Sequence, residues 1–96
     1  MHKKMRIKGE LLLREIAGEF VLVPVGETAL RIKGMICLSE SGALLWKQLQ
    51  TGANREELLQ KLQDNYEIDA DTAKSDLESF LQSMTALDLL QETDYE

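Results

Sequence analysis

The sequence is poor in the residues on which many enzymes and secreted scaffolds depend. It has one cysteine, Cys37, and one histidine, His2. A single cysteine excludes an internal disulfide and the disulfide framework of small secreted domains, so we expect a reducing, cytoplasmic environment. Cys37 has no second cysteine or nearby histidine to activate it or complete a zinc site, and apolar neighbours predict that it is buried or half-buried. His2 is expected to belong to an unstructured terminus.

Long hydrophobic runs and glycine-rich motifs are also missing. Lys8, Gly9 and Glu10 interrupt the first apolar stretch, so no signal peptide is expected. No segment approaches the roughly 20 apolar residues of a membrane-spanning helix. The six glycines are too dispersed for a nucleotide-binding loop. We therefore expect no membrane segment, no cofactor, no metal and no catalytic residues, and we interpret the carboxylates of residues 56–78 as a solvated surface.

Basic residues are outnumbered by acidic ones, 11 to 17, which gives a net charge of −6. The acidic residues concentrate in the C-terminal half, whereas the first 33 residues are slightly basic. A strongly acidic half repels the phosphates of nucleic acids, so no nucleic-acid partner is expected.

The N-terminal half of the chain has the pattern of strands. At 96 residues and 44% hydrophobic composition, the chain is predicted to form a single domain over residues 1–96 with its core at about 9–91. Residues 11–16 and 20–24 read as a hairpin around Gly18 that ends at Pro24. Residues 25–34 are expected to form a connecting loop, and residues 35–38 a third short strand.

The C-terminal half has the periodicity of helices. Ser39 is placed to cap a helix that ends near Gln50, with Trp46 as its core anchor. Asn54 and residue 57 have the spacing of a capping box for a second helix that ends near Tyr66. Asp69 is placed to cap a third, longer helix, after which residues 89–90 close the core before a polar tail. The predicted fold is α+β: a small three-stranded antiparallel sheet plus a three-helix bundle.

A known family shares these elements in the same order. Residues 38–46 (LSESGALLW) resemble the start of the helical part of the PqqD family, named for pyrroloquinoline quinone biosynthesis protein D. Further matching pieces are residues 21–24 (VLVP), Gly52, residues 57–59 (ELL), Tyr66 and residues 76–81 (DLESFL). The resemblance covers about residues 9–91. It departs from the family at Ser39 and Ser41, where Asn or Asp and Thr are frequent, and the 25–34 loop is longer than in the shortest members.

The resemblance implies a winged-helix-like domain that acts as a peptide chaperone. Such domains bind the leader part of a ribosomally made precursor peptide and present it to a modifying enzyme, often a radical S-adenosylmethionine protein. An exposed strand edge suits this role, because an extended peptide can pair with it as a further strand. The family's groove lies between the third strand and the third helix. Carried over to this sequence, the peptide-binding residues are Met35, Ile36, Cys37, Leu38, Asp76, Leu77, Phe80 and Met84.

The sequence also agrees with other interpretations. Leu77 and Met84 also suit ordinary core packing, since one helical stripe has to serve both core and groove, and Asp76 also suits a solvent-facing position. Two further functions are a winged-helix DNA-binding module, which the acidic third helix disfavours, and a structural subunit of a larger enzyme.

Overall fold

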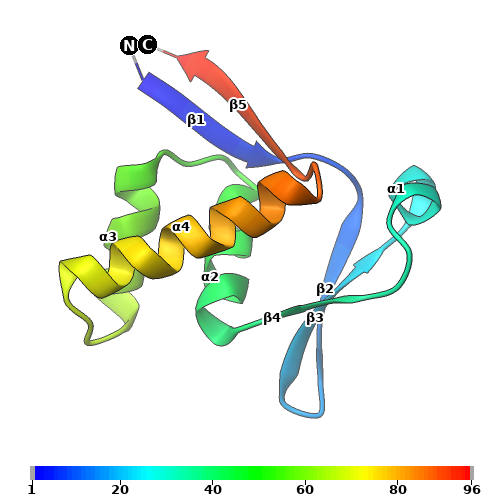
Figure 1. Ribbon diagram of the computed structural model, residues 1–96, viewed down its shortest axis with the longest axis horizontal. Coiled ribbons are helices and arrows are strands. Elements are labelled where there is room, and N and C mark those ends of the chain that lie inside the picture. Colours follow the sequence, from blue (N-terminus) through cyan, green and yellow to red (C-terminus); the bar gives the residue numbers. More distant parts are fainter. Residues whose placement is uncertain (1, 96) are drawn as a thin grey trace.

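A computed structural model describes the backbone of residues 2–95 and the side chains of residues 4–92. Helices α2, α3 and α4 lie together, the β2–β3 hairpin and α1 lie to one side of them, and β4 runs between (Figure 1). In chain order the elements are β1 (His2–Ile7), β2 (Leu11–Ile16), β3 (Glu19–Pro24), α1 (Gly26–Arg31), β4 (Ile36–Leu38), α2 (Glu40–Leu49), α3 (Arg55–Asn65), α4 (Ala70–Ala86) and β5 (Leu90–Tyr95).

The predicted three-stranded antiparallel sheet is present, with strand order β2-β3-β4. Strands β2 and β3 are joined by a two-residue turn in which Ala17 and Gly18 have φ angles of 52° and 82°. Positive φ at both positions is typical of the turn whose twist matches that of a hairpin. Strand β4 is three residues long and pairs with β3 alone, so its other side is an edge of the sheet.

The predicted helices α2, α3 and α4 are confirmed, together with the residues that cap them. The amide of Gly42 donates to Ser39 Oγ (3.0 Å), and the amide of Thr72 donates to Asp69 Oδ1 (2.7 Å). The capping box of α3 is reciprocal, since Glu57 N donates to Asn54 Oδ1 (2.8 Å) and Asn54 N donates to Glu57 Oε1 (2.9 Å). Each cap satisfies amides that have no partner inside the helix.

The hydrophobic core lies between these three helices and β3. Trp46 is 3% exposed, which confirms that it anchors α2 in the core. Its companions are fully or almost fully buried: Leu22 from β3, Leu45 and Leu49 from α2, Leu58 and Leu62 from α3, and Leu77, Leu81 and Met84 from α4.

The expected loop over residues 25–34 is wrong in part, because it contains α1. Val25 precedes this six-residue helix without a side-chain cap. Contacts with distant segments stabilise it instead: buried Thr28 accepts a hydrogen bond from Glu10 N (2.7 Å), and Arg31 Nη1 donates to Leu87 O (2.7 Å). A helix of this length has too few turns to show a period in the sequence.

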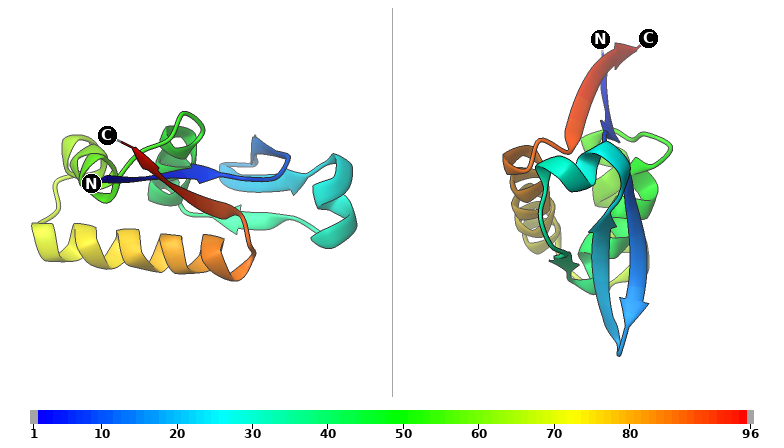
Figure 2. Two further views of the ribbon diagram at one scale, coloured as in Figure 1. Left: turned by 90° about the horizontal axis from the view of Figure 1, so that it is seen from above. Right: turned by 90° about the vertical axis from the view of Figure 1, so that its right-hand side faces the viewer.

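A second sheet is formed by β1 and β5, so the expectations of an unstructured N-terminus and a plain polar C-terminal tail are both wrong. These strands pair antiparallel from His2↔Tyr95 to Ile7↔Leu90, so residues 2–7 are not unstructured and residues 90–95 are not a plain tail. The two ends of the chain therefore lie side by side (Figures 1 and 2). Met5 fastens this sheet to the helices, because it is 2% exposed and exchanges backbone hydrogen bonds with Ala53 (2.8 and 3.0 Å).

Candidate functional site

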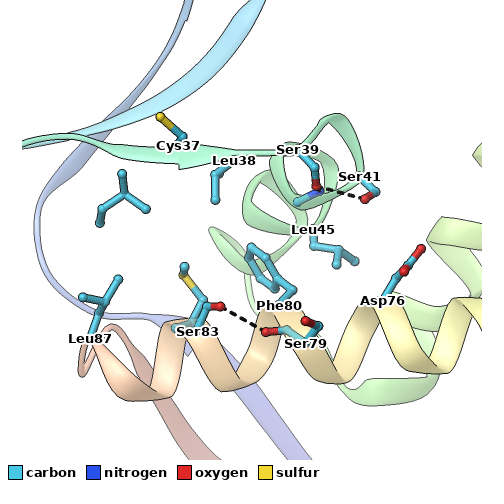
Figure 3. A pocket seen from close by; sticks show the side chains of 13 residues that line it. Cys37, Leu38, Ser39, Ser41, Leu45, Asp76, Ser79, Phe80, Ser83 and Leu87 are labelled. Atoms are coloured by element: carbon cyan, nitrogen blue, oxygen red, sulfur yellow. Dashed lines mark hydrogen bonds between the residues drawn. The ribbon is translucent and has the colours of Figure 1, made fainter.

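A groove of about 660 Å³ lies between β4, the start of α2 and one face of α4. Figure 3 shows it with β4 on one side and α4 on the other. Its lining residues come from three elements in turn: Ile36, Cys37 and Leu38 from β4; Ser39, Ser41, Gly42 and Leu45 from the α2 cap and first turns; and Asp76, Ser79, Phe80, Ser83, Met84 and Leu87 from α4 and its C-cap.

The structure brings most of the predicted site residues together in this groove. All of them line it except Met35 and Leu77. Met35 precedes β4 and is 62% exposed, whereas Leu77 is 2% exposed and belongs to the core. The alternative of core packing therefore holds for Leu77. Met84 serves both roles, since it is fully buried and also lines the groove.

Sequence reasoning missed the four serines of the lining. Ser79 and Ser83 follow Asp76 at steps of three and four, so helical spacing places all three on one face of α4 and could have identified the serines. Ser39 and Ser41 enter the lining because α2 begins directly after β4.

Three of the four serine hydroxyls in the lining have partners within the protein. Ser39 Oγ lies 3.2 Å from Ser41 Oγ, and Ser83 Oγ donates to Ser79 O (3.1 Å). Between these polar groups, Leu38, Phe80 and Met84 give the groove an apolar centre. A site with an apolar centre and a few polar groups at its margin is typical of ligand-binding clefts.

The turn between β2 and β3 sets which backbone groups of β3 face β2. In a two-residue hairpin the residues that flank the turn exchange hydrogen bonds, and such pairs then alternate along the strands. The odd-numbered residues of β3, from Glu19 onward, therefore bond to β2. The next odd-numbered residue after β3, Val25, continues this pattern, because its N–H donates to Glu10 O (2.9 Å) on the β2 side.

The even-numbered residues Phe20 and Leu22 consequently turn their backbone groups toward β4, where their partners are Leu38 and Ile36. Cys37 lies between these two partners, so its N–H and C=O point away from β3, toward the open edge. Side chains alternate as well: Leu38 points toward α4, whereas Cys37 points away from it (Figure 3). The open edge of β4 thus offers the Cys37 amide and carbonyl beside the groove.

The predicted burial of Cys37 is wrong, because its side chain is exposed. An apolar sequence context suggested a covered strand, but Cys37 belongs to an edge strand and its side chain lies on the sheet face that turns away from α4. Among residues 4–92, whose side chains the structure describes, no group of three or more His, Cys, Asp or Glu is placed to hold a metal ion.

A second, smaller hollow of about 230 Å³ lies on another part of the surface, lined by residues that include Phe20, Glu40, Lys47 and Tyr66. Burial, and secondarily the negative charge of Glu40, raises the pKa of the Tyr66 phenol above its ordinary value. No open strand edge adjoins this hollow, because the strand it touches, β3, is the central strand of its sheet.

Comparison with known families gives a match to one family over most of the chain. The family model described as coenzyme PQQ synthesis protein D (PqqD) matches residues 19–90. The chain belongs to the PqqD family. The matched range includes β3, β4 and the three large helices, and with them the whole lining of the groove. Strands β1 and β2 lie before it, and β5 lies almost wholly beyond it.

Among solved structures, the chain is similar to one described as TbiB1 in complex with the TbiA(beta) leader peptide. The TM-score is 0.69 and the sequences are 24% identical, with 95% of this chain and 98% of the other covered. This likeness confirms the α+β fold expected for a member of the PqqD family. Comparison with curated proteins gives no match. Within residues 2–95 every helix is too short or too polar to cross a membrane.

Proposed function

We propose that this protein binds an extended leader segment of a ribosomally made precursor peptide by adding it to the edge of β4. The observation that carries this proposal is the open edge at Cys37, which lies directly beside a groove of about 660 Å³. The unpaired N–H and C=O of an edge strand are hydrogen-bonding groups that an extended chain can satisfy.

The groove gives the added strand a means of side-chain selection. Alternate side chains of a strand point to the same face and are about 6.8 Å apart. Guest side chains level with Ile36 and Leu38 would therefore enter the apolar centre beside Phe80 and Met84. Backbone pairing would supply sequence-independent affinity, and burial of these side chains would supply preference for particular peptides.

The comparisons support this role without assigning a particular pathway. The chain belongs to the PqqD family, and its resemblance to that family implies a peptide chaperone. The similar solved structure, TbiB1, is described in complex with a leader peptide. We further propose that the bound leader is presented to a separate modifying enzyme, with a radical S-adenosylmethionine protein as the first candidate.

The other free edge of the three-stranded sheet, on β2, offers a matched control. By the same alternation, Glu15 turns its N–H outward at that edge, and its side chain is exposed. No residue of β2 lines the groove. Proline at position 15 would thus remove an outward amide from an edge that has no groove beside it.

The proposal is tested with proline substitutions and peptides selected from a random display library, with a variable region of about twelve residues. Cys37→Pro should keep its helical circular dichroism and cooperative melting but lose the selected peptides, because the guest loses a ladder bond and meets the proline ring. Glu15→Pro and Cys37→Ala should bind as the parent does. Ile36→Pro should damage the sheet, since the Ile36 amide bonds to β3.

Equal peptide affinity in the parent and in folded Cys37→Pro would show that the peptide docks elsewhere. A library that yields no peptide sensitive to Cys37→Pro would likewise refute strand addition at β4.

A further inference from the structure

Asp76 is the one charged side chain among the described residues that line the groove. It lies on α4 at the end of the groove near Ser41, and Leu87 marks the opposite end (Figure 3). Between them the α4 lining is formed by Phe80, Met84 and two serines. The groove therefore has an apolar centre with an acidic group at one end only.

Two other carboxylates, one on α4 and one directly after its C-cap, are paired with cations. Glu78 forms an ion pair with Arg55. Asp88 lies beyond Leu87 and pairs with Lys8 Nζ at 2.7 Å; the hydrogen bond and charge of Lys8, together with the charge of Arg31, lower the pKa of the Asp88 carboxyl below its ordinary value.

Asp76 differs from these carboxylates. Within the part of the chain that the structure describes, no cation or hydrogen-bond donor is paired with it. The negative charge of Asp76 at the groove is thus free for a cation that arrives with the guest.

We infer that the guest peptide carries a lysine or arginine whose side chain lies against Asp76, an inference that rests on the proposed function. A strand added to β4 has groove-facing side chains about 6.8 Å apart. Those level with Ile36 and Leu38 meet the apolar centre. The next one in the series, beyond Leu38, lies at the Asp76 end (Figure 3). The preferred guest therefore has a basic residue two positions from an apolar one.

The expected effect is modest because Asp76 is exposed. Exposed ion pairs change a binding constant by about 1.5- to 5-fold, and the effect decreases as salt rises. Asp76 would therefore determine which peptides are preferred, while backbone pairing determines that an extended peptide binds at all.

The experiment uses the random peptide display library on the parent protein, Asp76→Asn and Asp76→Lys. Asp71→Asn is the matched control, since Asp71 is an exposed acid on the same helix that does not line the groove. Only peptides whose binding is lost in folded Cys37→Pro are analysed, so that the site of binding is established separately from its charge preference.

Among these edge-dependent peptides, we expect an excess of lysine or arginine at one position, two residues from an apolar side chain. Asp76→Asn should weaken their binding about 1.5- to 5-fold and Asp76→Lys more strongly, with both differences reduced at high salt. Asp71→Asn should leave the affinity unchanged, and Asp76→Lys should select peptides with an acidic residue at the same position.

Edge-dependent peptides without such a basic position, or an affinity that Asp76→Asn changes no more than Asp71→Asn, would overturn this inference and leave the proposed function intact. A failure to obtain any edge-dependent peptide would overturn both.

Discussion

Replacement of Trp46 by alanine should remove a large part of the stability of this domain. The side chain is 3% exposed and belongs to the core cluster that includes Leu49 and Leu58. Truncation of a buried tryptophan to alanine costs about 3–5 kcal/mol, because it forfeits apolar burial and leaves a cavity. A domain of 96 residues has a total stability of about 5–14 kcal/mol, so the variant should fold at 25 °C only with a reduced margin.

The magnitude can be read as a change in melting temperature. The unfolding entropy near the midpoint is about 2.1 cal/mol/K per residue, or about 0.2 kcal/mol/K for this chain. A cost of 3–5 kcal/mol therefore corresponds to a decrease of about 15–25 °C, measured by thermal circular dichroism. Trp46→Phe is the control, since it retains an aromatic ring and should lower the midpoint by less than half as much. A decrease below about 5 °C for Trp46→Ala would refute the placement of this ring in the core.

Three further predictions concern the groove, the hairpin and nucleic acids. Ser83→Phe should fill the groove and abolish binding of edge-dependent peptides in a fluorescence titration, whereas Ser75→Phe, on an exposed part of α4 that does not line the groove, should leave binding unchanged. Ala17→Gly should raise the stability to urea by about 1 kcal/mol, because alanine is strained at a φ of 52°; a decrease would contradict the turn geometry. Duplex DNA should show negligible binding at physiological salt in an anisotropy assay, because the acidic α4 repels phosphates, and micromolar affinity that weakens with salt would revive the winged-helix interpretation.

The features that sequence reasoning predicted well are those with a local signature. Asn54 and Glu57 are three residues apart, and the capping box they form depends on that spacing alone. The hairpin likewise follows from two apolar runs around a short turn that contains Gly18. The family resemblance added the location of the groove, which no local pattern indicates.

The features that it missed depend on contacts between distant parts of the chain. Helix α1 is held by Thr28 with Glu10 and by Arg31 with Leu87, and neither contact has a periodic signature. Strands β1 and β5 pair from opposite ends of the chain, so each lacks a neighbouring strand in the sequence. The exposure of Cys37 follows from its place on an edge strand. The three apolar residues of β4 have the same sequence pattern whether the strand is at an edge or covered, so the sequence alone does not distinguish the two cases.

Amide hydrogen exchange of β4, followed by NMR in the free protein and with a saturating edge-dependent peptide, tests the open edge most directly. In the free protein the amides of Ile36 and Leu38 should exchange slowly because they bond to β3, whereas the Cys37 amide should exchange rapidly. Peptide binding should protect the Cys37 amide strongly. A Cys37 amide that is already protected in the free protein, or that remains unprotected when the peptide is bound, would contradict strand addition at β4.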